Sequence, residues 1–220
     1  MQWWQILLIV LASIAVLAVL TILLYKPVFK RFWDIVISFT GLLILWLPML
    51  IIGIIIKADS KGPMLYKQKR LGKRKKQFTV LKFRSMCDHA YEKGGVATSE
   101  GDSRITKVGR FLRKTSIDEF PQLINILLGQ MSIIGPRPIL DWEYEEFADE
   151  KYEPRFKVRP GMFCTVDVKY RAEASRELQF QMDTDYAKHI KFSTDLKTFF
   201  GIIKTVLSGK SVYREENKNE

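Results

Sequence analysis

The stretch Ser116-Ile117-Asp118-Glu119-Phe120-Pro121-Gln122-Leu123 places two adjacent carboxylates directly before an apolar run that continues to Leu128. A dense group of cations precedes it: Arg104, Lys107, Arg110, Arg113 and Lys114. The stiff turn Gly135-Pro136-Arg137-Pro138 follows it and adds one more guanidinium. Acidic side chains beside a helix N-terminus and several arginines are typical of sites that bind phosphate with a divalent metal. The stretch therefore predicts a helix over 121–128 and a phosphate-handling site at its start.

The same residues allow a purely structural interpretation. Ser116 and Glu119 have the spacing of a capping box, in which both side chains satisfy free N–H groups at a helix start. Asp118 would then be a first-turn acid favoured by the helix dipole. Pro121 would remove a backbone hydrogen bond from a helix that began at Ser116, so Asp118 could equally be the cap. The residues alone leave both interpretations open.

Composition narrows the kind of partner. The 220 residues carry a formal net charge of +11, with a pI of about 9.6, which implies an acidic partner such as nucleic acid, anionic lipid or a phosphorylated substrate. The sequence contains no RNP-type or zinc-finger pattern, so nucleic acid is not expected. Cys87 and Cys164, far apart in the sequence, make no disulfide framework and fit a reducing compartment. His89 and His189 have no metal-ligand spacing to either cysteine, so a zinc site is not expected.

Residues 1–25 predict a transmembrane helix. This region contains no charged residue, and the apolar run Trp3–Leu24 is long enough for a hydrocarbon core of about 30 Å. Tryptophans at one end and Tyr25 at the other are typical of interfacial aromatic anchors. A cleaved signal peptide is disfavoured because a positive n-region and an A-x-A site are missing. The basic residues between 26 and 31 predict that the C-terminal end of the helix faces the cytoplasm.

Residues 26–57 form a second apolar segment, interrupted by Asp34 and Pro48. The region after it is even more basic than the region before it, so a helix that crossed the bilayer would leave one basic flank outside. A helix that bends at Pro48 and enters and leaves on the same side keeps both flanks in the cytoplasm. We therefore expect a re-entrant membrane helix, with Asp34 held near the interface beside Lys30 and Arg31.

Residues 58–213 predict a small, mainly helical cytoplasmic domain with short strands. The basic tract Lys67–Lys76 lies between two short apolar runs, so it predicts a hairpin whose turn faces anionic lipid headgroups. Residues 104–114 place apolar side chains on one helical face and cations on another. They predict an amphipathic helix that lies against a membrane surface or covers a core.

The rest of the domain predicts further short elements. Residues 141–152 are strongly acidic and predict a surface helix. Residues 162–170 alternate like a strand, and a last helix over 194–207 begins at the cap Ser193. The polar tail over 214–220 is expected to be disordered. The fold class is therefore α+β: a membrane-associated chain with a transmembrane helix, a re-entrant helix and a mainly helical domain.

Six segments, taken in order, carry a resemblance to a known family. They are Lys30–Asp34, Gly62–Gly72, Phe78–Met86, Asp102–Arg113, Ser116–Asn125 and Gly129–Pro138. The chain resembles the bacterial sugar transferases, the monotopic polyprenol-phosphate phosphoglycosyl transferases, from Lys30 to Leu207. So many long motifs in one order make the resemblance highly specific.

The resemblance implies a re-entrant membrane helix, a cytoplasmic catalytic domain and residence in the bacterial inner membrane. It implies transfer of a sugar phosphate from a UDP-sugar to undecaprenyl phosphate, the first membrane step of capsule, exopolysaccharide, O-antigen or glycoprotein glycan synthesis. In the family, the aspartate of the acidic pair is the nucleophile, forms a covalent phosphosugar intermediate, releases UMP and works with Mg²⁺. That aspartate corresponds to Asp118, which is also the expected metal contact, and its neighbour corresponds to Glu119.

The chemistry also requires cations. A carboxylate is a weak nucleophile and is repelled by a diphosphate, so positive side chains must neutralise the phosphate oxygens. The candidates are Arg113, Arg137 and Arg159, with Lys82 and Arg84 behind them. Structural ion pairing is the competing interpretation of these arginines. A different class of function also stays open: a non-catalytic membrane scaffold that binds anionic lipid and a partner enzyme. Whether the chain forms a homo-oligomer is open as well.

The sequence departs from the family in three places. The membrane helix Trp3–Leu24 is an addition to the smallest members. Leu47 stands before Pro48 where a small polar residue often occurs, so the exact bend is open. Residues 162–173 differ from the usual Gly-Trp-x-Gln-Val and Gly-Arg-Asn pattern, so the identity of the sugar is open.

Overall fold

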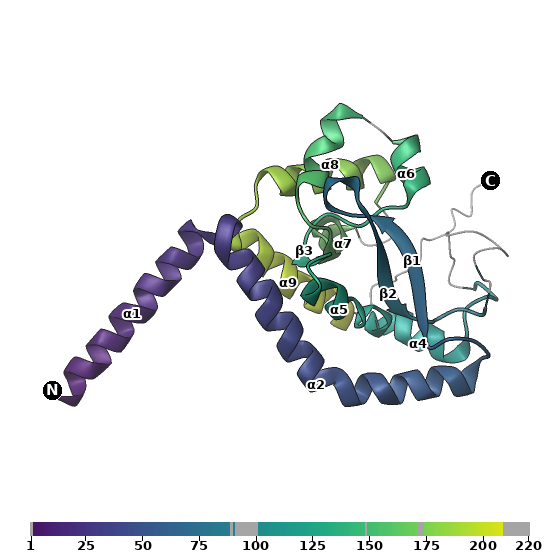
Figure 1. Cartoon of the computed structure of the whole chain (residues 1–220), viewed down its shortest axis with the longest axis horizontal. Coiled ribbons are helices and arrows are strands. Elements are labelled where there is room, and N and C mark those ends of the chain that lie inside the picture. Colours follow the sequence, from purple (N-terminus) through teal and green to yellow (C-terminus); the bar gives the residue numbers. More distant parts are fainter. Residues whose placement is uncertain (1, 89, 91–100, 148, 171–173, 209–220) are drawn as a thin grey trace.

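The computed structural model describes residues 2–88, 90, 101–147, 149–170 and 174–208. Helices and a few short strands form a domain from which the first helix projects (Figure 1). The described chain is thus a mixed helix and strand structure, as the sequence predicts. The tail over 214–220, expected to be disordered, lies outside the described residues.

Two long apolar helices begin the chain. Helix α1 (Trp3–Leu23) and helix α2 (Lys30–Asp59) are joined by the π-helical turn η1 (Tyr25–Phe29). Both helices are long and apolar enough to cross a membrane. α1 points away from the domain, whereas α2 bends near its middle and the domain lies on the inner side of the bend (Figure 1). Pro48 lies inside α2, where a proline removes a main-chain hydrogen bond and favours a bend.

Polar side chains at the start of α2 bind it to the domain. Asp34 Oδ1 accepts hydrogen bonds from the Ser132 hydroxyl and the Ile133 N–H, both at 2.9 Å. Lys30 Nζ lies 2.5 Å from Asp195 Oδ2. Asp34 is only 4% exposed, so its main partners are donors on a strand and not only the neighbouring cations that the sequence suggests.

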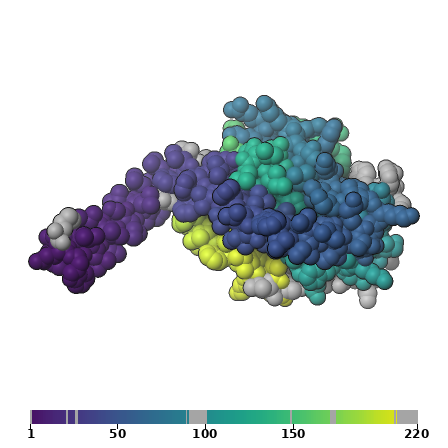
Figure 2. Space-filling view, turned by 60° about the horizontal axis from the view of Figure 1, so that its bottom comes forward, coloured from purple at the N-terminus to yellow at the C-terminus, as the bar shows by residue number. Residues whose placement is uncertain are grey.

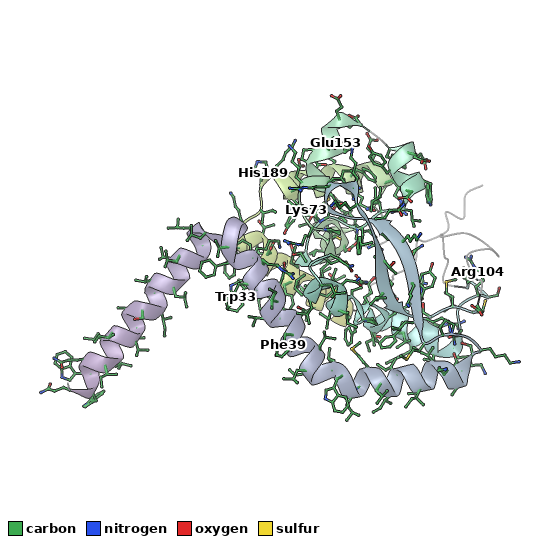
Figure 3. All side chains as sticks on the ribbon, in the orientation of Figure 1. Trp33, Phe39, Lys73, Arg104, Glu153 and His189 are labelled. Carbon is green, nitrogen blue, oxygen red and sulfur yellow. The ribbon has the colours of Figure 1, made fainter. Side chains whose placement is uncertain are left out.

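The basic tract forms a hairpin, as the sequence predicts. Strand β1 (Leu65–Leu71) pairs antiparallel with β2 (Gln77–Phe83) along its full length, and the turn η2 (Lys73–Lys75) joins them. Lys73 lies at the end of the domain opposite to the bend of α2 (Figure 3). The expectation that this turn faces anionic lipid headgroups stays a prediction. Local sequence defines the turn, but tertiary packing decides the direction in which the hairpin points.

Short helices and a second pair of strands complete the described domain. They are α4 (Lys107–Thr115), η3 (Ile117–Glu119), α5 (Gln122–Leu127), β3 (Ser132–Ile134), α6 (Asp141–Glu146), η4 (Glu150–Lys157), β4 (Gly161–Phe163), α7 (Thr165–Lys169), α8 (Arg176–Lys188) and α9 (Phe192–Leu207). β3 and β4 run parallel. The main core contains Val80, Ile126 and Ile133, and Leu42 and Leu45 of α2 pack against it. α2 is therefore part of this core as well as an apolar surface.

The second half of the domain differs most from the prediction. A strand is expected over 162–170, but only Gly161–Phe163 is a strand and most of the rest forms α7. α8 was not predicted, and it buries polar residues such as Gln179 and Asp183 beside Phe180. A helix that buries polar side chains lacks the apolar stripe by which a helix is recognised in a sequence.

Two other expected helices are present with different ends. The acidic helix expected over 141–152 is divided into α6 and η4, and Glu143 is buried. Arg176 lies 2.8 Å from Glu143, which explains how this carboxylate can be buried. At the last helix, Ser193 lies inside α9 and Lys191 occupies the cap position.

Candidate active site

The two carboxylates of the acidic pair lie at a sharp reversal between short helices. α4 ends at Thr115, and Ser116 takes up a left-handed conformation with a φ of 58°. This conformation costs a non-glycine residue about 1–2 kcal/mol, so it persists where the surrounding structure holds it. The 3₁₀ turn η3 then presents Asp118 and Glu119 before α5 begins at Gln122.

This geometry excludes the capping-box interpretation. Ser116 is the C-cap of α4, and its side chain accepts no capping hydrogen bond from η3. Pro121 occupies the N-cap position of α5 and has no side-chain acceptor. The side chain of Glu119 accepts from a lysine on β2 and not from the Ser116 N–H, as a capping box requires. Helix capping therefore does not explain the acidic pair.

Lys82 of β2 binds the second carboxylate of the pair. Its Nζ lies 2.5 Å from Glu119 Oε1, and the two side chains are only 27% and 22% exposed. Burial opposes the ionisation of Glu119, but Lys82, Arg137 and Arg70 together outweigh it and lower the pKa of Glu119. Glu119 is therefore an anion at neutral pH, held in place by a charge-assisted hydrogen bond.

Asp118 has a different environment. Burial raises the pKa of Asp118 to about 6, and the charge of Glu119 acts in the same direction. Lys82 and Arg113 oppose this shift, so Arg113 of α4 lies close enough to act on the carboxyl group. Asp118 therefore ionises close to neutral pH, whereas Glu119 is already ionised there.

Arg137 approaches the pair from the turn that follows β3. Its Nη1 lies 3.4 Å from both carboxylate oxygens of Asp167, and its side chain is 41% exposed. Asp167 raises the pKa of Arg137, and Glu119 adds to this effect. Arg137 is therefore a permanent cation that Asp167 holds, with a side chain that is partly open to solvent. Such a side chain can bind a phosphate oxygen.

Two predicted phosphate ligands lie in other surroundings. Arg84 is 5% exposed and donates from Nη2 to the carbonyl oxygen of Ser60 at 2.6 Å, at the end of α2. Arg159 Nε donates to the carbonyl oxygen of Gly129 at 2.8 Å, beyond the end of α5. Both cations meet helix C-termini, which carry partial negative charge. The structure thus brings Lys82, Arg113 and Arg137 to the acidic pair and gives Arg84 and Arg159 structural contacts.

Two charged residues at the site were not predicted. Arg70 lies in the basic tract that was interpreted as facing lipid, yet it helps to lower the pKa of Glu119. Asp167 lies in the stretch that was interpreted as a strand. The sequence does carry a signal for it, because Asp167 stands between Val166 and Val168. An acid in an apolar setting usually has a cationic partner.

The site suits a divalent cation that arrives with a phosphate. Among the described residues, no group of three or more His, Cys, Asp or Glu could hold a metal by itself. Asp118 and Glu119 are two adjacent carboxylates, and Mg²⁺ often binds through one or two carboxylates together with substrate phosphates. The donor set therefore fits Mg²⁺ shared between the acidic pair and a phosphate.

Comparison with known proteins extends the similarity to nearly the whole chain. A family model described as bacterial sugar transferase matches residues 25–209. The exopolysaccharide production protein PSS of Rhizobium leguminosarum bv. phaseoli is 38% identical over 193 residues, covering 82% of this chain and 96% of that protein. The matched region begins at the end of α1 and includes α2 and the acidic pair.

Two longer relatives are also similar. The UDP-N-acetylgalactosamine-undecaprenyl-phosphate N-acetylgalactosaminephosphotransferase of Aeromonas hydrophila is 36% identical over 195 residues, covering 85% of this chain and 46% of that protein. The UDP-glucose:undecaprenyl-phosphate glucose-1-phosphate transferase of Klebsiella pneumoniae is 36% identical over 193 residues, covering 84% of this chain and 42% of that protein. The chain therefore spans less than half the length of these two relatives.

Proposed function

Because the chain belongs to the bacterial sugar transferase family of enzymes, we propose that it transfers a sugar phosphate from a UDP-sugar to undecaprenyl phosphate and releases UMP. The relatives from Aeromonas hydrophila and Klebsiella pneumoniae are named for reactions of this kind. The observation that carries the proposal is the acidic pair at 118–119, beside which lie Lys82, Arg113 and Arg137. Two phosphates can approach each other and a carboxylate only where cations neutralise their charge.

In the first step, the Asp118 carboxylate attacks the phosphorus atom that carries the sugar. The bond from this phosphorus to the bridging oxygen of the diphosphate breaks, and UMP leaves with the bonding electrons. The sugar phosphate stays on Asp118 as an acyl phosphate. The raised pKa of Asp118, about 6, makes its carboxylate more basic than an ordinary one while it remains ionised at neutral pH. Arg113 and Arg137 stabilise the charge that develops on the phosphoryl oxygens.

In the second step, a phosphate oxygen of undecaprenyl phosphate attacks the same phosphorus atom. The bond to Asp118 breaks, the carboxylate is restored, and a diphosphate now joins lipid and sugar. Both steps place negative charge on the same phosphoryl oxygens, so one set of cations serves both. Asp118 and Glu119 are the residues that would hold Mg²⁺, which when bound would add to the neutralisation of these oxygens.

The lipid substrate requires a site at the membrane surface. We infer that α1 spans the bacterial inner membrane, that α2 enters and leaves it on the cytoplasmic side with its bend at Pro48, and that the domain lies in the cytoplasm. α2, α4 and α9 share the face turned to the viewer in Figure 2. Trp33 and Phe39 project from α2 away from the domain (Figure 3), and Phe111 of α4 and Phe200 of α9 are exposed. Exposed apolar side chains on a basic domain are typical of a surface that rests on anionic lipid.

The covalent role of Asp118 can be tested directly. Purified protein with Mg²⁺, undecaprenyl phosphate and a panel of UDP-sugars should release UMP with at least one donor, and mass spectrometry should detect a sugar-phosphate adduct on Asp118. Asp118→Asn should abolish both signals, since an amide is not nucleophilic. Asp185→Asn, a matched change at an exposed acid of α8, should retain them.

Unchanged UMP release by Asp118→Asn would rule out the covalent step. A folded wild-type protein that binds lipid but releases no UMP from any donor would favour a scaffold.

The pH dependence of adduct formation is a second readout of the same experiment. Burial favours protonated Asp118, so its contribution to stability is complete below pH 3.8 and is lost as the pH rises through about 6. The nucleophile appears over the same interval. The rate of adduct formation should therefore rise with pH and be half-maximal at about pH 6. Lys82→Met removes a cation that favours ionised Asp118, so it should move the midpoint to higher pH.

A further inference from the structure

The turn Gly135–Pro138 contains two prolines, which have no N–H to donate. Its glycine N–H donates to the carbonyl oxygen of Phe163 at 3.0 Å, and the carbonyl oxygen of Pro136 accepts from the Gly161 N–H at 2.8 Å. These bonds hold one end of the turn against β4. Arg137 lies between the prolines, so the groups that bind its N–H and its carbonyl oxygen fix the position of the main chain from which its side chain extends.

A buried ion pair binds both of these main-chain groups. Asp183 Oδ2 accepts from the Arg137 N–H at 3.2 Å and from Arg155 Nη2 at 2.7 Å. The same Nη2 donates to the carbonyl oxygen of Arg137 at 2.9 Å. The three groups thus form a closed ring of hydrogen bonds around the backbone of one residue. We name the pair of Arg155 and Asp183 the backbone clamp.

Stability alone is a poor explanation for the backbone clamp. Its side chains are 2% and 1% exposed, and the removal of two charges from water is costly. Three of its polar atoms, Arg155 Nε, Arg155 Nη1 and Asp183 Oδ1, have no hydrogen-bond partner among the residues that the structure describes, so the cost is only partly offset. Apolar residues of similar volume often replace such a pair with no loss of stability.

We propose that Arg155 and Asp183 are positioning residues, which hold the backbone of Arg137 so that its guanidinium meets the phosphate at the acidic pair. The inference rests on the proposed function, in which Arg137 is a phosphate ligand. Asp167 aligns the side chain of Arg137, and the backbone clamp aligns its main chain. The clamp side chains are too deeply buried to touch a substrate, so they act through Arg137 alone.

The test is a double-mutant cycle. The double variant Arg155→Met, Asp183→Leu is prepared in the full chain with and without Arg137→Ala. With native Arg137, the clamp replacement should lower kcat/KM for UMP release about 100-fold at a temperature where every variant is folded, the effect of misplacing a binding group by about 1 Å. With Arg137→Ala, the same replacement should cause no further loss. The loss of partners for the main chain at residue 137 should lower the thermal midpoint in both backgrounds. A purely structural role would also lower activity equally in both backgrounds.

A second ion pair provides the matched control. Arg104 Nη2 lies 2.6 Å from Asp102 Oδ2, and these side chains are 11% and 10% exposed. The pair belongs to the segment before α4 and binds within that segment, so the double variant Asp102→Leu, Arg104→Met should show the same fold-change with and without Arg137→Ala. If the clamp variant is unstable, Asp183→Asn keeps the shape of the side chain. Its loss should be smaller, about 10-fold, and should likewise vanish with Arg137→Ala.

The outcomes separate the two proposals. Suppose that the wild type releases UMP and that the clamp replacement lowers kcat/KM by the same factor with and without Arg137→Ala. The positioning role is then wrong and the proposed function stands. If the wild type releases no UMP, the proposed function fails, and calorimetry of UDP binding with Mg²⁺ on the same four proteins tests the clamp. The clamp replacement should then weaken UDP binding only where Arg137 is present. The inference would be overturned if the clamp replacement raised the Kd for UDP by the same factor with and without Arg137→Ala. It would also be overturned if the wild type did not bind UDP.

Discussion

The first two helices have similar apolar character and opposite relations to the rest of the molecule. None of α1 between Trp3 and Leu20 is buried inside the protein, whereas α2 buries Asp34, Ser38 and Gly53 against the domain. α2 also buries Ile56, and its Leu42 and Leu45 pack against the core, so the difference lies in particular positions and not in apolar length. Length and hydropathy thus identify both helices as membrane candidates, but these few positions decide that only α2 is built into the domain.

The start of α2 also contacts α5, the helix that follows the acidic pair. Arg31 donates from Nη1 to the carbonyl oxygen of Ile126 at 2.7 Å and from Nη2 to that of Leu127 at 3.1 Å. These carbonyls lie at the C-terminal end of α5, where a cation is favourable. Because α5 directly follows η3, a displacement of α2 should also displace Asp118 and Glu119. Substitutions that disturb α2 should therefore lower activity, whereas matched substitutions in α1 should not.

The largest expected effect follows from Asp34→Ala in α2. The substitution leaves the Ile133 N–H and the Ser132 hydroxyl without their acceptor in a buried position. We expect a loss of stability of about 2–4 kcal/mol and a loss of UMP release, measured by thermal unfolding and by the transfer assay in lipid nanodiscs. Ser13→Ala, which removes an exposed hydroxyl from α1, is the control and should change neither. Equal effects of the two substitutions would contradict the distinction between the helices.

A moderate effect is expected where α2 packs on α5. A Cβ at Gly41 would lie 3.2 Å from Leu123 Cδ1, so a larger side chain has to push the two helices apart. Gly41→Leu should cost about 1–3 kcal/mol and lower the rate of UMP release. Ala12→Leu adds similar volume to α1, which has no buried side chains in this region, and should be neutral. A neutral Gly41→Leu would show that α2 packs less closely on the domain than the structure indicates.

The smallest effect should come from removal of α1. A chain that begins at Tyr25 keeps the aromatic residue whose hydroxyl donates to Asp195 Oδ2 at 2.6 Å, and it keeps all of α2. We expect it to remain bound to membranes, as measured by sedimentation with vesicles, and to release UMP at nearly the rate of the whole chain. A fall in the rate as large as that of Asp34→Ala would mean that α1 does more than anchor the protein.

The acidic pair illustrates how far the sequence predicts the site. Asp118 and Glu119 are adjacent, so their proximity needs no fold, and the motifs around them suffice to identify the family. The sequence could not predict which cations contact the two carboxylates, because nothing in it distinguishes the five candidates. Lys82 and Arg159 are both cations near short strands, yet one binds Glu119 and the other binds the end of α5.

The sequence by itself determined the two apolar helices, the hairpin, the acidic pair and the family, because each depends on residues that are close together in the chain or on motifs in a fixed order. The tertiary structure alone decided the partners of the buried charges. Asp34 binds Ile133 across 99 residues, and Asp183 binds Arg137 across 46. A buried charge needs a partner, but its sequence position does not say which one. Only the packing of α2 and α8 against β3 and its following turn brings these groups together.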